Sequence, residues 1–296
     1  MKEKRRYHTL RLLLALLPAT ALWSCTQDEM PSPAATGEED ARLPLTVQVA
    51  DAGFAPDGNL STRTADVGYK TTFGIGDSIG IYVSRKRDIV PYKNLLFVLT
   101  EEGWENADGQ PLWYEGSNSR YYAYYPYQPG GVEILPTNWD ANVYFRPLIR
   151  EWQIPADQST YKKYTAADLM VCRGELDAET RRTLTFTFVH QMALLEIDLT
   201  EVIQADPTAT VTYHNFQPWQ PDPAVEIYRY LLQPEIASGT PPEVDKPLKD
   251  LCLSVTSSSG KVYDFEFTGI RDSGNRGKCK SYTLHWEGGR AAETGL

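Results

Sequence analysis

The stretch "LPLTVQV", residues 43–49, decides the fold class of this chain. Its aliphatic residues stand at every second position, with proline, threonine and glutamine between them. Because successive side chains of a β-strand point to opposite faces, a period of two gathers the aliphatic side chains on one face. We therefore expect a strand with one buried face, formed by Leu43, Leu45, Val47 and Val49.

The composition of the whole chain favours the same kind of structure. With 296 residues, of which 42% are apolar, the chain is long enough for two ordinary domains with real cores. Eighteen tyrosines, 20 prolines and 21 glycines favour strands joined by turns over long helices. The predicted fold class is all-β.

Strand-like segments follow one another beyond residue 70, among them "DSIGIYVS", "NLLFVLT", "RYYAYYPYQ" and "LCLSVT". In residues 182–199 the apolar positions change parity near Gln191, which predicts a bulge or a register switch. The segment "EVIQADPTATV" then joins a larger block to a smaller one. We expect two β-sandwich domains, at residues 43–205 and 206–288, followed by a tail at 289–296.

The first residues are typical of bacterial export. Five basic residues precede the apolar run Leu12–Leu22, which is well short of the roughly 20 residues that span a bilayer. Residues 1–24 are therefore predicted to be a signal peptide. Its end, "LWSC", is similar to the lipobox of bacterial lipoproteins, although Trp23 is larger than the usual residue there. We expect a membrane-anchoring lipid on Cys25; an ordinary signal peptide ending near a cysteine is the alternative.

Residues 25–42 are predicted to be a disordered tether, because they are rich in Pro, Ala, Glu, Asp and Gly. Within them "QDE" is similar to the acidic export signal of surface lipoproteins in Bacteroidetes, which implies the outer face of the outer membrane.

Charge and cysteine spacing exclude several partners. Removal of residues 1–24 changes the formal net charge from −10 to about −14, so no nucleic-acid partner is expected. Cys172, Cys252 and Cys279 show no C-x-x-C spacing, and neither a metal site nor a cofactor is predicted. Cys252 and Cys279 could form a disulfide outside the cytoplasm, with buried thiols as the alternative.

One motif and one histidine invite an enzymatic interpretation. "GDSIG", residues 76–80, resembles the Gly-Asp-Ser block of a lipase and esterase family, in which Ser78 would be the nucleophile. That family needs an Asp-x-x-His block, and this spacing does not occur in the chain. His190 shares the parity of neighbouring apolar residues, which favours a structural histidine. We expect a turn entering a strand at "GDSIG" and no catalytic activity.

The tyrosine run "RYYAYYPYQ" suggests sugar binding, because aromatic rings pack against pyranose faces. Tyrosines of this run stand at both parities, however, so both faces of the strand would be aromatic. This pattern favours a packed core over an open sugar site.

The order of four motifs resembles the fimbrillin family of Bacteroidales. These motifs are "TADVGYKTTFGIGDSIGIY", "GWENADGQPLWYEGSNSRYYAYYPYQ", "YTAADLM" and "FTFVHQMALLEIDL". The resemblance implies a transthyretin-like, two-domain β-sandwich pilin that reaches the surface as a lipoprotein. It also implies cleavage between Arg63 and Thr64, which would remove the strand at Leu43–Val49 and let a strand of another fimbrial subunit take its place.

One departure from the family concerns position in the fimbria. The tail "GGRAAETGL" has no alternating apolar face and so offers no evident strand to donate, which favours a tip subunit that binds a glycan or protein on a host or bacterial surface. The rival hypothesis is a monomeric outer-membrane surface lipoprotein that binds glycans and keeps its lipid. The receptor and the position in the fimbria stay open.

Overall fold

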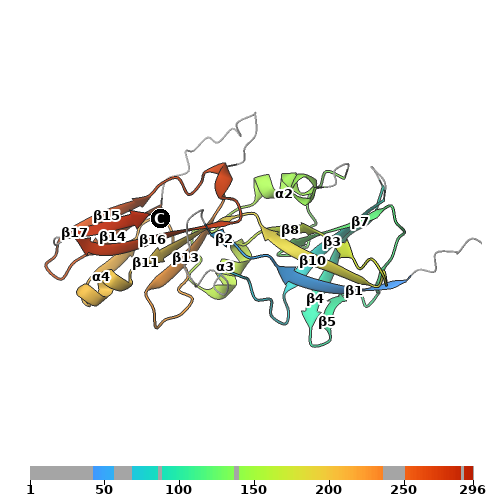
Figure 1. Ribbon diagram of the computed structural model, residues 1–296, viewed down its shortest axis with the longest axis horizontal. Helices are drawn as coiled ribbons and strands as arrows, with labels where there is room; N and C mark the ends of the chain where they lie inside the picture. The colour runs from blue at the N-terminus through green and yellow to red at the C-terminus, as the bar shows by residue number, and fades with distance from the viewer. Residues whose placement is uncertain are drawn as a thin grey trace, which may run out of the picture. The chain divides into compact units, whose positions relative to one another are not determined.

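The computed structural model describes residues 43–56, 69–85, 89–136, 140–235, 251–287 and 290–295. Strands make up most of its regular elements, which confirms the all-β prediction (Figure 1). Within the described residues no helix is long and apolar enough to cross a membrane, and the longest has seven residues.

The first sheet contains nine strands in the order β6-β1-β5-β4-β3-β7-β8-β10-β9. An additional pairing between β1 and β10 closes this sheet on itself, so that β1 has a neighbour on each edge. The strands are β1 (Pro44–Asp51), β3 (Ser78–Arg85), β4 (Ile89–Thr100), β5 (Gly103–Asn106), β6 (Leu112–Trp113), β7 (Ser119–Tyr125), β8 (Met170–Arg173), β9 (Glu175–Leu176) and β10 (Thr183–His190).

Both faces of this sheet are buried at β7. This burial explains why tyrosines stand at both the odd and the even positions of the strand. Tyr121 and Tyr125 belong to the interior of the closed sheet, with Phe186 and Phe188 of β10. Tyr122 and Tyr124 belong to a second core on the other face. The expectation of packed tyrosines is confirmed, since the four in β7 are at most 4% exposed.

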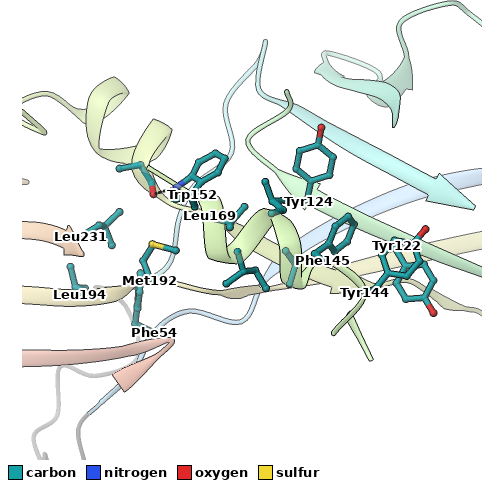
Figure 2. Close-up of a cluster of buried hydrophobic side chains, with 14 of the residues drawn as sticks. Phe54, Tyr122, Tyr124, Tyr144, Phe145, Trp152, Leu169, Met192, Leu194 and Leu231 are labelled. Carbon is teal, nitrogen blue, oxygen red and sulfur yellow. Dashed lines mark hydrogen bonds between the residues drawn. The ribbon is translucent and has the colours of Figure 1, made fainter. Parts of the chain in front are cut away.

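Three short helices cover that other face: α1 (Ala141–Tyr144), α2 (Arg146–Glu151) and α3 (Tyr161–Ala167). Figure 2 shows the ring of Tyr144 stacked on that of Tyr122. The two ring centroids are 3.9 Å apart. The indole N–H of Trp152 donates to the carbonyl of Ala167 at 2.9 Å. Aromatic packing thus holds segments that are too short to be stable helices alone.

The parity change near Gln191 marks a change of sheet and not a bulge. Strand β10 ends at His190, and β11 (Ala193–Asp198) pairs with β13 (Ile227–Leu232) and β16 (Lys278–Glu287) in a second sheet. The outer edge of β16 pairs with β2 (Ala55–Pro56) and β17 (Arg290–Gly295). The change of sheet therefore precedes the predicted domain boundary at 205/206, which stays a prediction.

A third sheet completes the C-terminal region: β12 (Thr210–Tyr213), β14 (Leu251–Thr256) and β15 (Val262–Phe267). Its apolar face packs against the second sheet, where Leu195 and Ile197 meet Leu253 and Val255 in one core. The short helix α4 (Thr200–Ala205) and the 3₁₀ turn at Ser273–Asn275 lie between strands. The residues "SSSG", 257–260, form the hairpin turn between β14 and β15.

The tail differs from expectation. Residues 290–295 form β17 and pair antiparallel with β16, although their sequence lacks an alternating apolar face. Strand pairing uses backbone N–H and C=O groups, which every non-proline residue has. The argument for a tip position that rested on a strandless tail therefore loses its support.

Candidate functional site: the seam filled by strand β1

The candidate site is the position of β1 in the closed sheet, between β10 on one edge and β5 and β6 on the other. We call this position the seam (Figure 1). Strand β1 pairs in parallel with β10 at six residue positions. On its other edge Val47 lies opposite Trp104 of β5, and Leu45 lies opposite Leu112 of β6. The closed sheet is therefore continuous only while β1 is in place.

The side chains of β1 alternate as the sequence predicts. Leu45 and Val47 are 6% and 5% exposed, and Leu43 and Val49 are half-buried against the same core. Pro44, Thr46 and Gln48 are exposed. The predicted buried face is confirmed, and it belongs to the interior of the first sheet.

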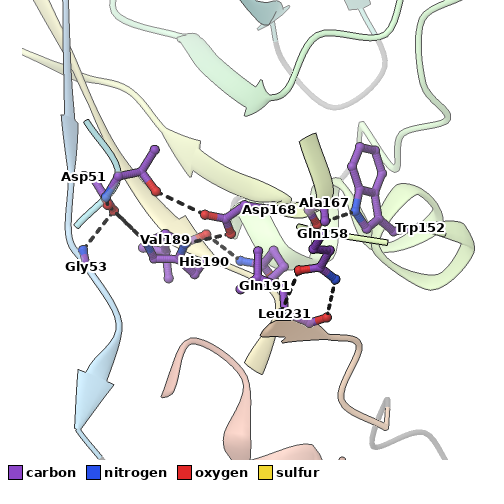
Figure 3. A network of polar contacts seen from close by, with 11 residues as sticks. Asp51, Gly53, Trp152, Gln158, Ala167, Asp168, Val189, His190, Gln191 and Leu231 are labelled. Atoms are coloured by element: carbon purple, nitrogen blue, oxygen red, sulfur yellow. Dashed lines mark hydrogen bonds and ion pairs between the residues drawn. The ribbon is translucent and has the colours of Figure 1, made fainter. Parts of the chain in front are cut away.

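A buried polar cluster closes one end of the seam (Figure 3). His190, the last residue of β10, lies between two carboxylates. Its Nδ1 is 2.8 Å from Asp168 Oδ1, and its Nε2 is 3.0 Å from Asp51 Oδ1 and 3.1 Å from Oδ2. The three side chains are at most 3% exposed. Asp51 is the last residue of β1, so the cluster joins the seam-filling strand to the rest of the sheet.

Charge favours the protonated imidazole. Burial by itself would lower the pKa of His190, but Asp168 and Asp51 raise that pKa to about 9. Burial opposes ionisation of Asp51 as well, yet the hydrogen bond to His190 and the backbone N–H groups of Gly53 and Thr71 lower its pKa. At neutral pH both ring N–H groups therefore donate to carboxylates, which confirms the prediction that His190 is hydrogen-bonded.

Sequence reasoning missed the partnership of Asp51 with His190. Asp51 has the parity of Leu45, Val47 and Val49, so the alternation places its carboxylate on the buried face. A carboxylate on a buried face needs a charged or hydrogen-bonding partner, and this need is the signal in the sequence that indicates a partner for Asp51. The partner itself is 139 residues away in sequence.

The other predicted site residues have separate outcomes. Cys25, Arg63 and Thr64 lie outside the described residues. Cys252 in β14 and Cys279 in β16 belong to different sheets and do not form a disulfide. Cys172 does not form one either. Burial raises the pKa of the Cys279 thiol to about 12. Among the described residues, no three His, Cys, Asp or Glu side chains gather in a metal-binding arrangement.

The "GDSIG" motif forms the predicted turn and the start of a strand. The N–H of Asp77 donates to the carbonyl of Gly74 at 2.9 Å, and Ser78 begins β3. A different serine, Ser254, lies between His214 and Asp264, accepting from one ring nitrogen at 2.5 Å and donating to the carboxylate at 2.5 Å. Its proton already faces a carboxylate and Ser254 is 5% exposed, so this arrangement is not that of an activated nucleophile.

Comparison with known proteins identifies the family of this chain. The family model described as fimbrillin-like matches residues 62–218. The chain belongs to the fimbrillin-like family. Over 203 residues this fimbrillin-like protein is 27% identical to Fim1C of Bacteroides ovatus, which is named as a fimbrium tip subunit. The match covers 66% of the chain and 35% of that relative, so the chain spans about a third of the relative's length.

A solved structure shows the same fold. A fimbrial protein from Bacteroides ovatus matches the fimbrillin-like protein with a TM-score of 0.58 at 21% identity, over 82% of this chain and 48% of that one. A protein from Bacteroides uniformis named for cell adhesion matches with a TM-score of 0.49 at 17% identity, over 86% of this chain and 97% of that one.

Proposed function

We propose that this fimbrillin-like protein is a non-catalytic structural subunit of a cell-surface fimbria, and that other fimbrial subunits are its partners. Family membership and the similarity to Fim1C support this function. The observation that carries the proposal is the place of β1: a strand near the start of the described chain fills a seam between β10 and the β5–β6 edge.

Proteolysis provides the step that opens the seam. In the proposal the chain reaches the outer membrane as a lipoprotein anchored through Cys25, and a protease then cuts between Arg63 and Thr64. Both β1 and β2 precede this bond. The cut therefore separates the lipid and the seam-filling strand from the rest of the subunit, and a strand of a neighbouring subunit takes the seam.

The energetics favour replacement of β1 over a vacant seam. At about 1.5–3 kcal/mol for each fully buried aliphatic side chain, Leu43, Leu45, Val47 and Val49 contribute at most about 6–12 kcal/mol before entropy is subtracted. The edge of β10 would also lose backbone hydrogen bonds over six paired positions. A strand from a second subunit restores both contributions, so assembly needs no external source of energy.

The decisive experiment is N-terminal sequencing of the protein sheared from cells, together with two arginine variants. Fimbrial material should begin at Thr64. Arg63→Ala should reach the surface but fail to enter polymers. Arg42→Ala is the matched control, because a cut after residue 42 would leave β1 attached, and it should assemble normally.

The opposite results have equally clear meanings. Normal incorporation of Arg63→Ala would reject this cleavage site. A lipid-blocked Cys25 as the only mature form, with no polymer, would overturn the fimbrial function in favour of the monomeric surface lipoprotein that binds glycans.

A further inference from the structure

The polar end of the seam divides into groups that leave with β1 and groups that stay. Asp51 and Gly53 precede the proposed cut, whereas Thr71, Asp168 and His190 follow it. Thr71 N is 2.6 Å from Asp51 Oδ2, and its hydroxyl donates to Asp168 at 3.1 Å. The body of the subunit therefore keeps the buried imidazole of His190 (Figure 3). It also keeps the backbone N–H of Thr71, and both groups are aimed at the place of one carboxylate.

The aliphatic residues of β1 cannot choose the register by themselves. A shift by one residue moves Leu45, Val47 and Val49 to the wrong face and is strongly opposed. A shift by two residues preserves their parity: in one direction each aliphatic side chain replaces another, and in the other direction Asp51 moves to the place of Val49. Such a shift, however, places Val49 or Gly53 where Asp51 lies, and His190 then loses one of its two partners. The carboxylate thus distinguishes registers that the apolar pattern leaves nearly equal.

We propose that the seam accepts strands whose buried face ends in a carboxylate, two residues after the last of three alternating aliphatic residues. His190 and Thr71 form the socket for this carboxylate, which selects the partner strand and fixes its register. This inference rests on the proposed function, because it concerns the strand that replaces β1.

The chemistry of the socket discriminates between side chains. An aliphatic residue leaves the Nε2–H of His190 and the N–H of Thr71 without an acceptor in a buried place, and an amide offers one neutral oxygen to two donors. A lysine or arginine would meet a like charge. Neighbouring backbone contacts, such as Ala52 N to Phe188 O at 3.0 Å and Ala55 N to Gly277 O at 2.8 Å, accept any non-proline residue and do not select.

The test uses the full chain with a site-specific protease sequence inserted after Arg63. After cleavage, fluorescent peptides of residues 43–56 compete with the resident segment, and anisotropy reports entry and dissociation. The peptide series contains the native sequence, Asp51→Asn, Asp51→Glu and, as a matched control at an exposed position, Gln48→Asn.

We expect the native and Gln48→Asn peptides to be retained equally, and Asp51→Asn to dissociate about tenfold to a hundredfold faster, since hydrogen bonds to charged groups are the strong ones. Asp51→Glu should recover part of the loss. Equal retention of native and Asp51→Asn peptides would overturn the socket and leave strand exchange intact. Failure of every peptide to enter would overturn strand exchange, and the socket with it.

Discussion

The N-terminal sheet and the C-terminal sheets enclose their hydrophobic cores in different ways. The first closes through β1, whose partner β10 comes more than 130 residues later in the chain. The second and third sheets form a core from β11 and β14 and their neighbours, and β2 adds only two paired positions at the edge of β16. Loss of the segment before Arg63 would therefore open the first sheet but only shorten an edge of the second.

The burial of their side chains also distinguishes β1 from β2. Leu45 and Val47 of β1 lie in the interior of the first sheet, whereas Ala55 and Pro56 of β2 are exposed. A strand that shields a core is costly to remove, and one that only extends an edge is not. The comparison teaches that the dependence on a replaceable strand is a property of the N-terminal sheet.

A buried charge in β1 should produce the largest effect. Val47→Asp places a carboxylate without a partner in the core, and we expect a loss of about 3–5 kcal/mol in the free energy of unfolding, measured with urea. Hydrogen exchange should rise in β5 and β10 more than in β11 and β14. Gln48→Asp adds the same charge at an exposed position and should change stability by less than about 0.5 kcal/mol. Equal effects of the two variants would contradict the placement of β1.

Matched cavities in the two regions should separate stability from strand release. Leu45→Ala and Leu253→Ala each remove a buried leucine side chain, and each should lower the free energy of unfolding by about 2–5 kcal/mol. After cleavage on the C-terminal side of Arg63, only Leu45→Ala should speed the release of residues 43–56. Size-exclusion chromatography measures this release. Faster release in Leu253→Ala as well would show that the two regions do not differ in this respect.

The smallest effect is a pH dependence confined to the polar end of the seam. The pKa of His190 is about 9 in the folded protein against an ordinary value of 6.5, because Asp168 and Asp51 face it. Its contribution is therefore fully present below pH 6.5 and is lost as the pH rises through 9. We expect the free energy of unfolding to fall by on the order of 1–3 kcal/mol across this window.

Two carboxylate variants locate that pH dependence. Asp51→Asn should reduce the fall, because one of the two charges that raise the pKa of His190 is gone. Asp157→Asn removes an exposed carboxylate elsewhere and should keep the full slope between pH 6.5 and 9. An unchanged slope in Asp51→Asn, or a flat profile in the unmodified protein, would contradict the assigned protonation state.

Several features of this protein were readable from the sequence because their causes are local. The alternation at Leu43–Val49 predicts a half-buried strand, and the tyrosines of residues 120–128 predict a strand packed on one face and half covered on the other. "GDSIG" predicts a turn, since glycine tolerates the positive φ of 94° at Gly76. The inward parity of Asp51 was equally visible, but it indicates only that a partner exists.

Tertiary structure alone decided the rest, because it depends on which distant segments meet. The parallel pairing of β1 with β10, the three helices at 141–167, the change of sheet after His190 and the pairing of β17 leave no periodic signal of their own. The alternating side chains determine that residues 43–49 form a strand with a buried face. Where that face is buried, and that Asp51 meets His190 there, follows from contacts across more than 130 residues, which no local pattern encodes.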